Sequence, residues 1–437
     1  MLLRTLPSSS LGKVILSASF TIAALLVLAT FAGFTGPINA LSTLYGGNNS
    51  STPLTTLALE KVLSDARPVF GESVYASTDK SDWMKAYPDD TPLTRMNIPG
   101  THDAATWNYS LATQRYLDHV TDLVDTTEFD PAAYRCQTRS FAQMLDDGIR
   151  AFDLRYAYDV TNSSLVFWHG PALQSQTATV DDVMYGFYRW LDQHPSEVVF
   201  LSFQYQTSTT PYATNSQGVQ SLLFDTLTSP AAKQYIQQTT GEIGTLGESR
   251  GRIVLLKRFD LDRLPASYDA ALPGLRFSPT DWTENGDNIT LTLNASTGLT
   301  AYIEDYFLPQ TSSHSTAEEN IQWKLNATSA HLHMAASHGI RHAKPHAHDD
   351  LFWTFASSTK LPNIPPITPT MQALGNGSSA TTTTTTTTPG RGGGVNHQLV
   401  PILREMRGQR LGIVMFDFYE EPGELLDVFL GLLPPAY

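Results

Sequence analysis

The order of apolar and polar residues predicts short buried strands separated by helix-length segments. Strands are predicted at 95–98, 149–154, 165–168, 198–203, 252–256, 301–303 and 412–416, most of them largely apolar runs. Such runs, without strict alternation, are typical of strands covered on both faces, as in parallel sheets. Helical stretches at 141–148 and from Thr179 lie between them. We therefore expect an α/β fold, a TIM-type (β/α)8 barrel in regular or distorted form, with an open doubly wound sheet as the alternative.

The first forty residues carry a segment that directs a chain into the secretory pathway. Arg4 and Lys13 precede an almost wholly apolar run of 21 residues at 14–34. Cleaved signal peptides have apolar cores of ~7–15 residues, whereas ~20 residues span a bilayer. Ala40 also ends an acceptable cleavage site, so residues 1–40 are either a signal peptide or a signal anchor. The rest of the chain is then expected to be extracellular or anchored at the cell surface.

Composition changes mark the other boundaries. Residues 41–84 begin rich in Ser, Thr and Gly and predict a linker, so that the barrel occupies 85–437. Within the barrel, 362–394 contains prolines, an unbroken threonine run and three consecutive glycines, which predict a low-complexity insertion. Eight Asn-x-Ser/Thr triplets predict a glycoprotein and begin at Asn48, Asn49, Asn108, Asn162, Asn288, Asn294, Asn326 and Asn376.

The overall charge excludes some partners. The chain of 437 residues has 28 basic and 42 acidic side chains, a formal net charge of −14. Nucleic-acid binding through phosphate neutralisation needs clustered Lys and Arg, so no nucleic-acid partner is expected. The single cysteine, Cys136, excludes an internal disulfide framework and a zinc site built from cysteines. We expect a monomer.

Polar residues with catalytic chemistry follow the predicted strands. His102 and Asp103 follow the first, Asp153 and Arg155 end the second, and His169 follows the third. The later strands end in Gln204, in Lys257 and Arg258, in Asp305 and Tyr306, and in Asp417. Active sites of such barrels lie at the carboxyl ends of the strands. Histidines, carboxylates and cations that meet there would supply a general base, a general acid and a site for an anion.

Three motifs resemble the X-domain signature of phosphatidylinositol-specific phospholipase C, above all its bacterial branch and fungal secreted relatives. They are Ile-Pro-Gly-Thr-His-Asp at 98–103, Gly-Ile-Arg-Ala-Phe-Asp-Leu-Arg at 148–155 and Trp-His-Gly at 168–170. The segments at 251–258 and 411–417 extend the resemblance over residues 85–430, apart from the insertion. The resemblance implies a phosphodiesterase of the phospholipase C type, acting at a membrane surface on a phosphoinositide or a glycosylphosphatidylinositol (GPI).

The resemblance also implies a role for each residue of the catalytic cluster. His102 is the implied general base for a substrate hydroxyl beside the phosphate, and His169 is the implied general acid for the leaving alcohol oxygen. Asp417 is implied to orient His102, and Asp103 to assist His169. Arg155 is implied to hold the phosphate oxygens with its planar guanidinium.

The same motifs imply that no metal or other cofactor is required. Metal-dependent relatives carry acidic ligands in the second strand and an asparagine directly after the first histidine. This chain has Arg155 and Asp103 at those positions. A guanidinium can supply positive charge but cannot ligate a metal.

The implied head-group pocket departs from the bacterial pattern. Its residues are Asp153, Gln204, Lys257, Arg258, Asp305 and Tyr306. Gln204 stands where the bacterial relatives carry a lysine, and the aromatic residue that stacks on inositol is displaced to Tyr306 or Phe307. Phosphodiester chemistry is therefore implied more strongly than inositol specificity.

Two other functions stay open from the sequence. Gln204 favours a catalytically altered barrel that binds lipid head groups or glycans at the cell surface. The linker and glycosylation triplets favour a structural cell-surface glycoprotein, although that function leaves the histidines and Arg155 unexplained.

Overall fold

The structure, a computed structural model, describes residues 52–73, 80–121, 130–207, 209, 213–341, 349–375 and 393–431. The chain divides into two compact units, Met1–Ala58 and Leu59–Tyr437. The apolar run at 14–34 lies outside the described residues. None of the helices in the described ranges combines the length and hydropathy that a bilayer-spanning segment requires.

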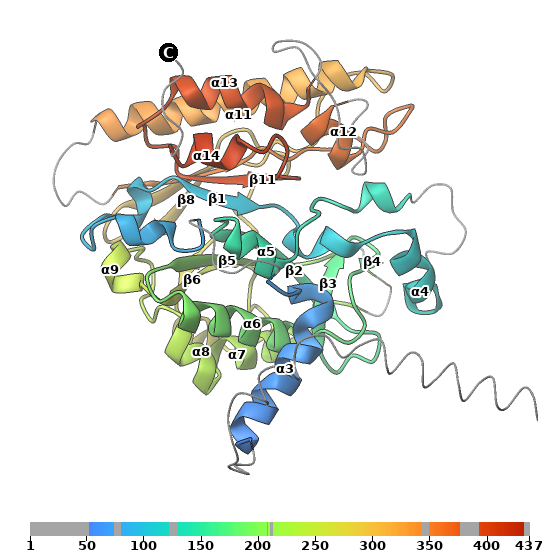
Figure 1. The fold of residues 1–437 in the computed structure, drawn as a ribbon, viewed down its shortest axis with the longest axis vertical. Coiled ribbons are helices and arrows are strands. Elements are labelled where there is room, and N and C mark those ends of the chain that lie inside the picture. Colours follow the sequence, from blue (N-terminus) through green and yellow to red (C-terminus); the bar gives the residue numbers. More distant parts are fainter. Residues whose placement is uncertain are drawn as a thin grey trace, which may run out of the picture. The chain divides into compact units, whose positions relative to one another are not determined.

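The second unit is built around an eleven-stranded sheet, in which nine strands follow the order β7-β6-β5-β2-β1-β11-β10-β9-β8 (Figure 1). The other two, β3 (Leu165–His169) and β4 (Ala172–Leu173), lie off this path, where β3 pairs with both β2 and β4. Its eight parallel strands are β1 (Ile98–Thr101), β2 (Ala151–Tyr158), β5 (Val198–Tyr205), β6 (Arg252–Arg258), β7 (Leu275–Arg276), β9 (Leu299–Glu304), β10 (Leu351–Phe355) and β11 (Ile413–Phe416). β8 (Ile289–Asn294) pairs antiparallel with β9. The strands form a barrel that is nearly closed. Its two edges are β7 and β8, and no ladder joins them within the described residues. This confirms the predicted distorted (β/α) barrel.

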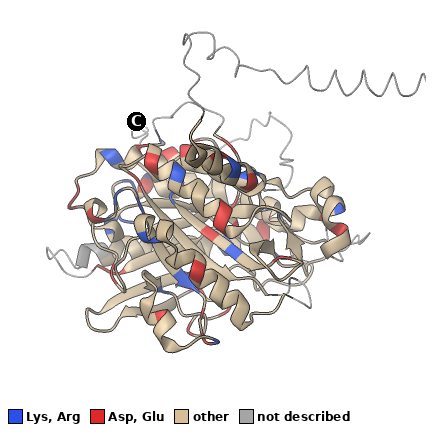
Figure 2. Cartoon of the chain, turned by 90° about the horizontal axis from the view of Figure 1, so that it is seen from below, with Lys and Arg blue, Asp and Glu red and all other residues tan. Residues whose placement is uncertain are grey.

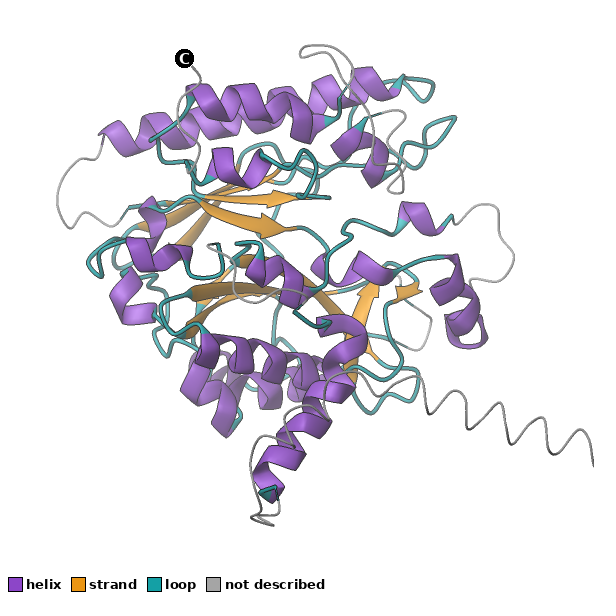
Figure 3. Ribbon diagram, in the orientation of Figure 1, coloured by secondary structure: helices purple, strands orange, loops and turns teal. Residues whose placement is uncertain are grey.

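Helices alternate with the strands and cover the outer face of the sheet. Figures 1 and 3 show α6, α7 and α8 on one side of the barrel and α11, α13 and α14 on the other. The α-helices are α3 (Leu54–Phe70), α4 (Leu111–Thr121), α5 (Phe141–Asp146), α6 (Val180–Gln193), α7 (Gln217–Thr228), α8 (Pro230–Tyr235), α9 (Leu246–Ser249), α10 (Ala266–Ala271), α11 (Ala317–Arg341), α12 (Pro369–Leu374), α13 (Val395–Glu405) and α14 (Leu425–Phe429). Short 3-10 turns are η1 (Trp83–Ala86), η2 (Leu93–Arg95), η3 (Ala104–Asn108) and η4 (Pro131–Ala133).

Local sequence explains where two of these helices begin. The Ser140 hydroxyl accepts a hydrogen bond from the Gln143 amide, and the Gln143 side chain accepts one from the Ser140 amide. Thr179 and Asp182 form the same reciprocal cap before α6. Such capping boxes satisfy two amide groups that the first helical turn would leave unpaired. The helices predicted near 141 and from Thr179 are thereby confirmed.

Successive side chains of each strand point to opposite faces, and two hydrophobic clusters result. Ile98, Ala151, Phe200, Leu256 and Met415 belong to the cluster inside the barrel. Phe152, Val199, Leu255, Val414 and Phe416 belong to the cluster between the strands and the helices. This alternation also decides which strand-end residues can face the barrel mouth.

Some boundaries differ from those that composition predicts. α3 lies within the predicted linker 41–84, and its residues Ala66, Val69 and Phe70 are buried in the outer cluster. The predicted insertion 362–394 includes α12, in which Ala373 and Leu374 are buried, while 376–392 lies outside the described residues. Average composition does not reveal these two helices, because a few buried apolar side chains are enough to stabilise a helix in an otherwise polar segment.

β10 is absent from the predicted strands, although Leu351–Phe355 is an apolar run. Trp353 and Phe355 point into the barrel, and the ring of Phe355 lies 6.1 Å from that of His102. The periodicity signal for this strand was present in the sequence and should have identified it.

Arg150 anchors the amino-terminal end of β2 and supports a stability prediction. Its fully buried guanidinium donates to Glu197 Oε2 from Nε at 2.9 Å and from Nη2 at 2.8 Å, and also to the carbonyl oxygens of Leu145 and Ser81. Replacing Arg150 with Met leaves Glu197 as an unpaired buried charge, and we expect the free energy of unfolding to fall by about 3–5 kcal/mol. Urea unfolding of Arg150→Met measures it. The control is Arg252→Met, whose side chain is exposed. A loss no greater than in the control would contradict the structural role of Arg150.

Candidate active site

His102 and Asp417 form a pair because β1 and β11 are parallel neighbours. The register places Thr101 opposite Phe416, so His102 and Asp417 are the next residues on the two strands. Both continue the inward-facing set, and the His102 Nδ1 to Asp417 Oδ1 distance is 2.9 Å. The structure thus brings together two residues that are 315 positions apart in the sequence.

The chain turns sharply after both residues. Asp103 has φ 41° and Phe418 has φ 47°. Aspartate tolerates the left-handed conformation, but a bulky aromatic residue seldom adopts it. The Gln137 amide donates to the carbonyl oxygens of His102 and Phe416, at 2.8 and 2.9 Å, and holds the two strand ends together. Left-handed residues of this kind concentrate at functional sites.

Arg155 connects the carboxylates to His102. Its Nε lies 2.9 Å from Asp103 Oδ1 and donates to Asp153 Oδ2 at 3.1 Å. Its Nη2 lies 2.8 Å from His102 Nε2. Since a guanidinium only donates, His102 Nε2 accepts here, and Nδ1 carries the proton that faces Asp417. This tautomer leaves the Nε2 lone pair as the position that can take a proton.

His169 reaches the site by a different route from the one predicted. Its strand, β3 (Leu165–His169), pairs antiparallel with β2, so it belongs to a hairpin and not to the barrel. Because the hairpin turns back, the end of β3 points at the barrel mouth. There His169 Nε2 lies 3.1 Å from Asp103 Oδ2, and Nδ1 lies 2.9 Å from the Tyr134 carbonyl oxygen. The same Asp103 oxygen lies 3.3 Å from His102 Nε2.

The two imidazoles have opposite electrostatic environments. Burial lowers the pKa of His102, but the carboxylates of Asp417 and Asp103 outweigh it, so its pKa is raised. Burial lowers the pKa of His169, and Asp103 offsets this only in part, so its pKa stays below the usual value. Burial raises the pKa of Asp417 against the opposing effect of His102. The histidine whose pKa is higher is therefore His102.

Alternate residues of a strand point to opposite faces, so only some of the predicted head-group residues face the inside of the barrel. Asp153, Gln204, Arg258 and Asp305 continue the inward set, and the register pairs Gln204 with both Arg155 and Arg258. Arg258 Nη2 donates to Asp305 Oδ2 at 2.9 Å. Gln204 Oε1 is buried and, within the described residues, has no hydrogen-bond partner.

Lys257 and Tyr306 are not brought into this cluster, which corrects their predicted placement. Lys257 is adjacent to Arg258 and therefore faces outward, where its Nζ donates to the Leu272 carbonyl oxygen at 3.3 Å. The ring of Tyr306 packs on Trp323 of α11, with 3.8 Å between centroids. The prediction assigned every polar residue at a strand end to the barrel mouth. Alternate residues of a strand point to opposite faces, so some of these side chains face away from the mouth.

Trp282 belongs to the site and was missed. Its ring lies 3.6 Å from the Arg258 guanidinium carbon, and its Nε1 donates to Asp305 Oδ2 at 2.8 Å. The residue lies in the loop between β7 and β8, where neither periodicity nor a motif marks it.

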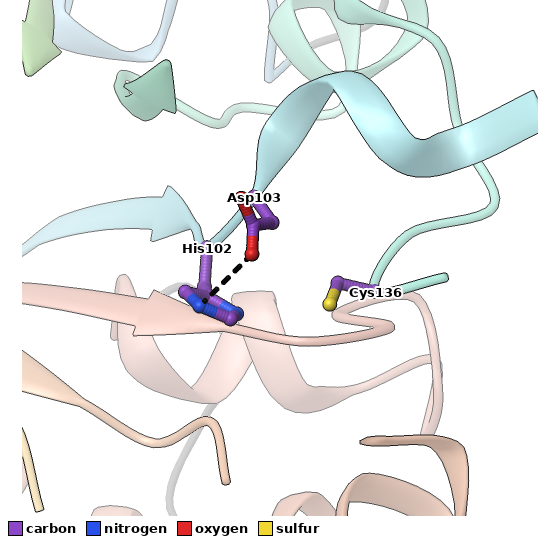
Figure 4. Close-up of side chains that lie close together, drawn as sticks. All are labelled: His102, Asp103 and Cys136. Carbon is purple, nitrogen blue, oxygen red and sulfur yellow. Dashed lines mark ion pairs between the residues drawn. The ribbon is translucent and has the colours of Figure 1, made fainter. Parts of the chain in front are cut away.

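Figure 4 shows His102, Asp103 and Cys136 close together, with ligand-type atoms within 4.8 Å of one another. Burial raises the pKa of Cys136 well above its usual value, and a metal would need the thiolate. Arg155 already places a cation 2.9 Å from Asp103 Oδ1. The donor set therefore fits a metal poorly.

Over the described chain, acidic and basic residues are interspersed (Figure 2).

The raised pKa of His102 gives a pH prediction. Replacing Asp417 with Asn removes a carboxylate that raises this pKa, so the pKa should fall. The acidic limb of the rate profile that belongs to His102 should then move to lower pH, while the maximal rate drops about 10²–10⁴-fold because the imidazolium loses its stabilising partner. Imidazole NMR titration and a pH–rate profile measure the two effects. Asp90→Asn, at an exposed position, is the control, and an unchanged or higher His102 pKa in Asp417→Asn would contradict the assignment.

Comparison with known proteins identifies relatives of this chain. Residues 126–259 match the family model described as phosphatidylinositol-specific phospholipase C, X domain. The PI-PLC X domain-containing protein 1 of Danio rerio is 33% identical over 134 residues, covering 28% of this chain and 42% of that protein. The 1-phosphatidylinositol phosphodiesterase of Listeria monocytogenes is 29% identical over 182 residues, covering 41% and 49%. The chain thus matches less than half the length of either relative.

Solved structures extend the likeness to the fold. A double mutant of the phosphatidylinositol-specific phospholipase C from S. aureus has a TM-score of 0.58 at 15% identity, covering 84% of this chain and 100% of that one. The enzyme from Listeria monocytogenes has a TM-score of 0.54 at 19% identity, covering 82% and 100%. The resemblance to the X-domain family of phosphatidylinositol-specific phospholipase C is therefore confirmed, by the family model over 126–259 and by a barrel shared with the bacterial structures.

Proposed function

We propose that this protein is a phosphodiesterase of the phospholipase C type that cleaves a phosphoinositide or GPI-like phosphodiester. The observation that carries the proposal is the placement of two imidazoles on one carboxylate. His102 Nε2 and His169 Nε2 lie 3.3 and 3.1 Å from the same Asp103 oxygen, and Arg155 lies against both Asp103 and His102. This arrangement offers a base, an acid and a cation around the space of one phosphate group.

The reaction follows from these positions. His102 Nε2 takes the proton of the substrate hydroxyl next to the phosphate, and that oxygen forms a bond to phosphorus. The bond from phosphorus to the alcohol oxygen breaks, and His169 donates a proton to that oxygen. A phosphatidylinositol would yield diacylglycerol and a cyclic inositol phosphate. Arg155 stabilises the negative charge that grows on the phosphate oxygens.

Substrate binding changes the electrostatic environment of the two histidines. In the unliganded site His102 has the raised pKa and His169 the lowered one. The reaction requires a neutral His102, in agreement with the contact that its Nε2 accepts from Arg155, and a protonated His169. An anionic phosphodiester beside His169 favours its charged form. Substrate binding therefore supplies part of the proton arrangement that catalysis needs.

The proposal includes no metal cofactor. Arg155 supplies the positive charge at the place where a cation would act, and its contacts to Asp103 and Asp153 occupy oxygens that a metal would need. The guanidinium holds its charge throughout the working pH range.

The residues that would contact the substrate head group limit its identity less than the catalytic cluster limits the chemistry. Arg258, Asp305 and Trp282 form a polar and aromatic wall beside the catalytic cluster. Gln204 adds a neutral amide to it. We expect the enzyme to meet its substrate at a membrane surface and, given the predicted leader, outside the cell or anchored there.

Product analysis of the purified protein tests the function. Radiolabelled phosphatidylinositol and a GPI substrate are incubated separately, each with and without a chelator, and the phosphorylated products are identified. A cyclic phosphate formed equally in the chelator is the expected result. Absence of product from both substrates would overturn the phosphodiesterase proposal, and loss of product only in the chelator would overturn metal independence.

Gln204 supports a second candidate, a catalytically altered barrel that binds lipid head groups or glycans. Its buried Oε1 has no partner among the described residues, and a head-group hydroxyl that reached this oxygen would satisfy it. Vesicle or glycan binding without phosphodiester cleavage would favour this candidate. The variant Gln204→Lys would separate the two, since gain of cleavage indicates that only the missing charge limits the chemistry.

A further inference from the structure

A cavity of about 730 Å³ lies at the end of the barrel opposite the two histidines. Met96 and Asn97, which precede β1, and Leu411, which precedes β11, form part of its wall. His102 and Asp417 follow the other ends of the same strands. Four residues of a strand span about 13 Å at ~3.3 Å per residue. The cavity is therefore distinct from the catalytic cluster.

The cavity is lined by both apolar and basic side chains. Leu403 and Met406, at and just after the end of α13, and Val428 and Phe429 of α14 supply apolar side chains. The basic side chains are Arg95, Arg407 and Arg410, and no acidic residue is among its described lining. A cavity of ~300–1,000 Å³ with an apolar surface and a few polar groups is typical of small-molecule sites.

Among these basic residues, Arg410 is the one with buried nitrogens that lack a hydrogen-bond partner in the described part of the chain. Arg95 pairs with Asp349, and Arg407 donates to the Gly431 carbonyl oxygen at 3.1 Å. Arg410 Nε and Nη2 are buried, yet neither has a hydrogen-bond partner within the described residues. Its guanidinium carbon lies 4.7 Å from the centre of the Phe352 ring, a cation–π contact.

Unpaired buried donors are costly, and a guanidinium fits carboxylate or phosphate oxygens well. The carboxylates of Asp349 and Asp350 act on the charge of Arg410 through space, but neither accepts a hydrogen bond from it within the described residues. Because both nitrogens are buried, the guanidinium turns toward the cavity when a ligand oxygen accepts from its two free N–H groups. The apolar side chains of the same lining would at the same time accommodate a hydrocarbon chain.

We propose that this cavity binds an amphipathic anion, a single hydrocarbon chain with a carboxylate or phosphate head. The head pairs with Arg410 and the chain packs along α13 and α14. This site is independent of the phosphodiesterase proposal, because His102, His169 and Arg155 are not among its described lining residues.

Isothermal titration calorimetry of the full chain with monododecyl phosphate, below its micelle concentration, tests the site. Arg410→Gln should weaken binding at least tenfold, because it removes a charge-assisted hydrogen bond. Arg404→Gln is the matched control: Arg404 lies on α13, six residues before Arg410, pairs with Glu424 and does not line the cavity. Its affinity should stay within twofold of the unmodified chain. Inorganic phosphate and dodecyl maltoside, which lack the tail and the charge, should each bind at least tenfold more weakly.

Two further variants keep the test decisive. Ala336→Leu fills part of the cavity from α11 without changing charge and should also weaken binding of monododecyl phosphate. His169→Ala should bind it normally, whether or not the protein proves to be a phosphodiesterase. Wild-type affinity in both Arg410→Gln and Ala336→Leu would overturn the proposal. Equal binding of dodecyl maltoside, or loss of binding in His169→Ala, would overturn it as well.

Discussion

Replacing His102 or His169 with Ala should each lower kcat by about 10²–10⁴-fold, the usual contribution of a general base or acid. His102 accepts a proton from the substrate and His169 donates one to the leaving group, so neither imidazole can replace the other. The fold should survive, because both side chains are partly exposed at the barrel mouth, 16% and 19%, and neither packs in the core. Phosphodiester cleavage at saturating substrate measures kcat, and thermal unfolding measures stability.

A change of leaving group separates the two roles. An activated ester with a nitrophenol leaving group departs without a proton, so it should restore much of the activity of His169→Ala. The same substrate should leave His102→Ala inactive, because its hydroxyl still needs a base. His194→Ala is the control, since His194 pairs with Asp82 near the opposite end of the barrel. Normal turnover in either active-site variant would remove the assigned role of that histidine. Rescue of His102→Ala alone by the activated ester would reverse the two roles.

Strand register and side-chain alternation explain how much of the site the sequence could predict. His102 and Asp417 were predictable together, because each follows an apolar run and parallel neighbours end at one edge. Arg155 was predictable for the same reason, two residues after Asp153 on one face. Alternation should also have excluded Lys257, which is adjacent to the inward-facing Arg258 in β6.

Other features depend on tertiary structure that no local pattern records. His169 approaches through the antiparallel hairpin of β2 and β3, which looked like one more barrel strand because both kinds of strand are apolar. Trp282 reaches Arg258 from a loop, and loop conformation has no period to detect. α3 formed within a segment whose composition resembled a linker. In each case a long-range contact, absent from the local sequence, fixed the position.

Arg155 should be as important as either histidine, and its shape should matter as much as its charge. The guanidinium contacts Asp103, Asp153 and His102 at once, at 2.9, 3.1 and 2.8 Å. Arg155→Ala should lower kcat/KM by about 10²–10³-fold or more, as loss of a donor to the developing charge does elsewhere. It should also destabilise the fold, because two buried carboxylates lose their partner.

Arg155→Lys distinguishes catalysis from stability. An ammonium keeps the charge and one or two contacts, so this variant should fold with near-normal stability. It cannot bridge two carboxylates and the phosphate with a planar fork, so kcat should remain well below that of the unmodified protein. A phosphorothioate substrate supplies a further readout, since the preference for one sulfur stereoisomer should shrink when the fork is lost. Arg263→Lys, at an exposed position, is the control. Full activity and unchanged stereoselectivity in Arg155→Lys would show that only a positive charge is required there, and would remove the guanidinium from the proposed contact with the phosphate.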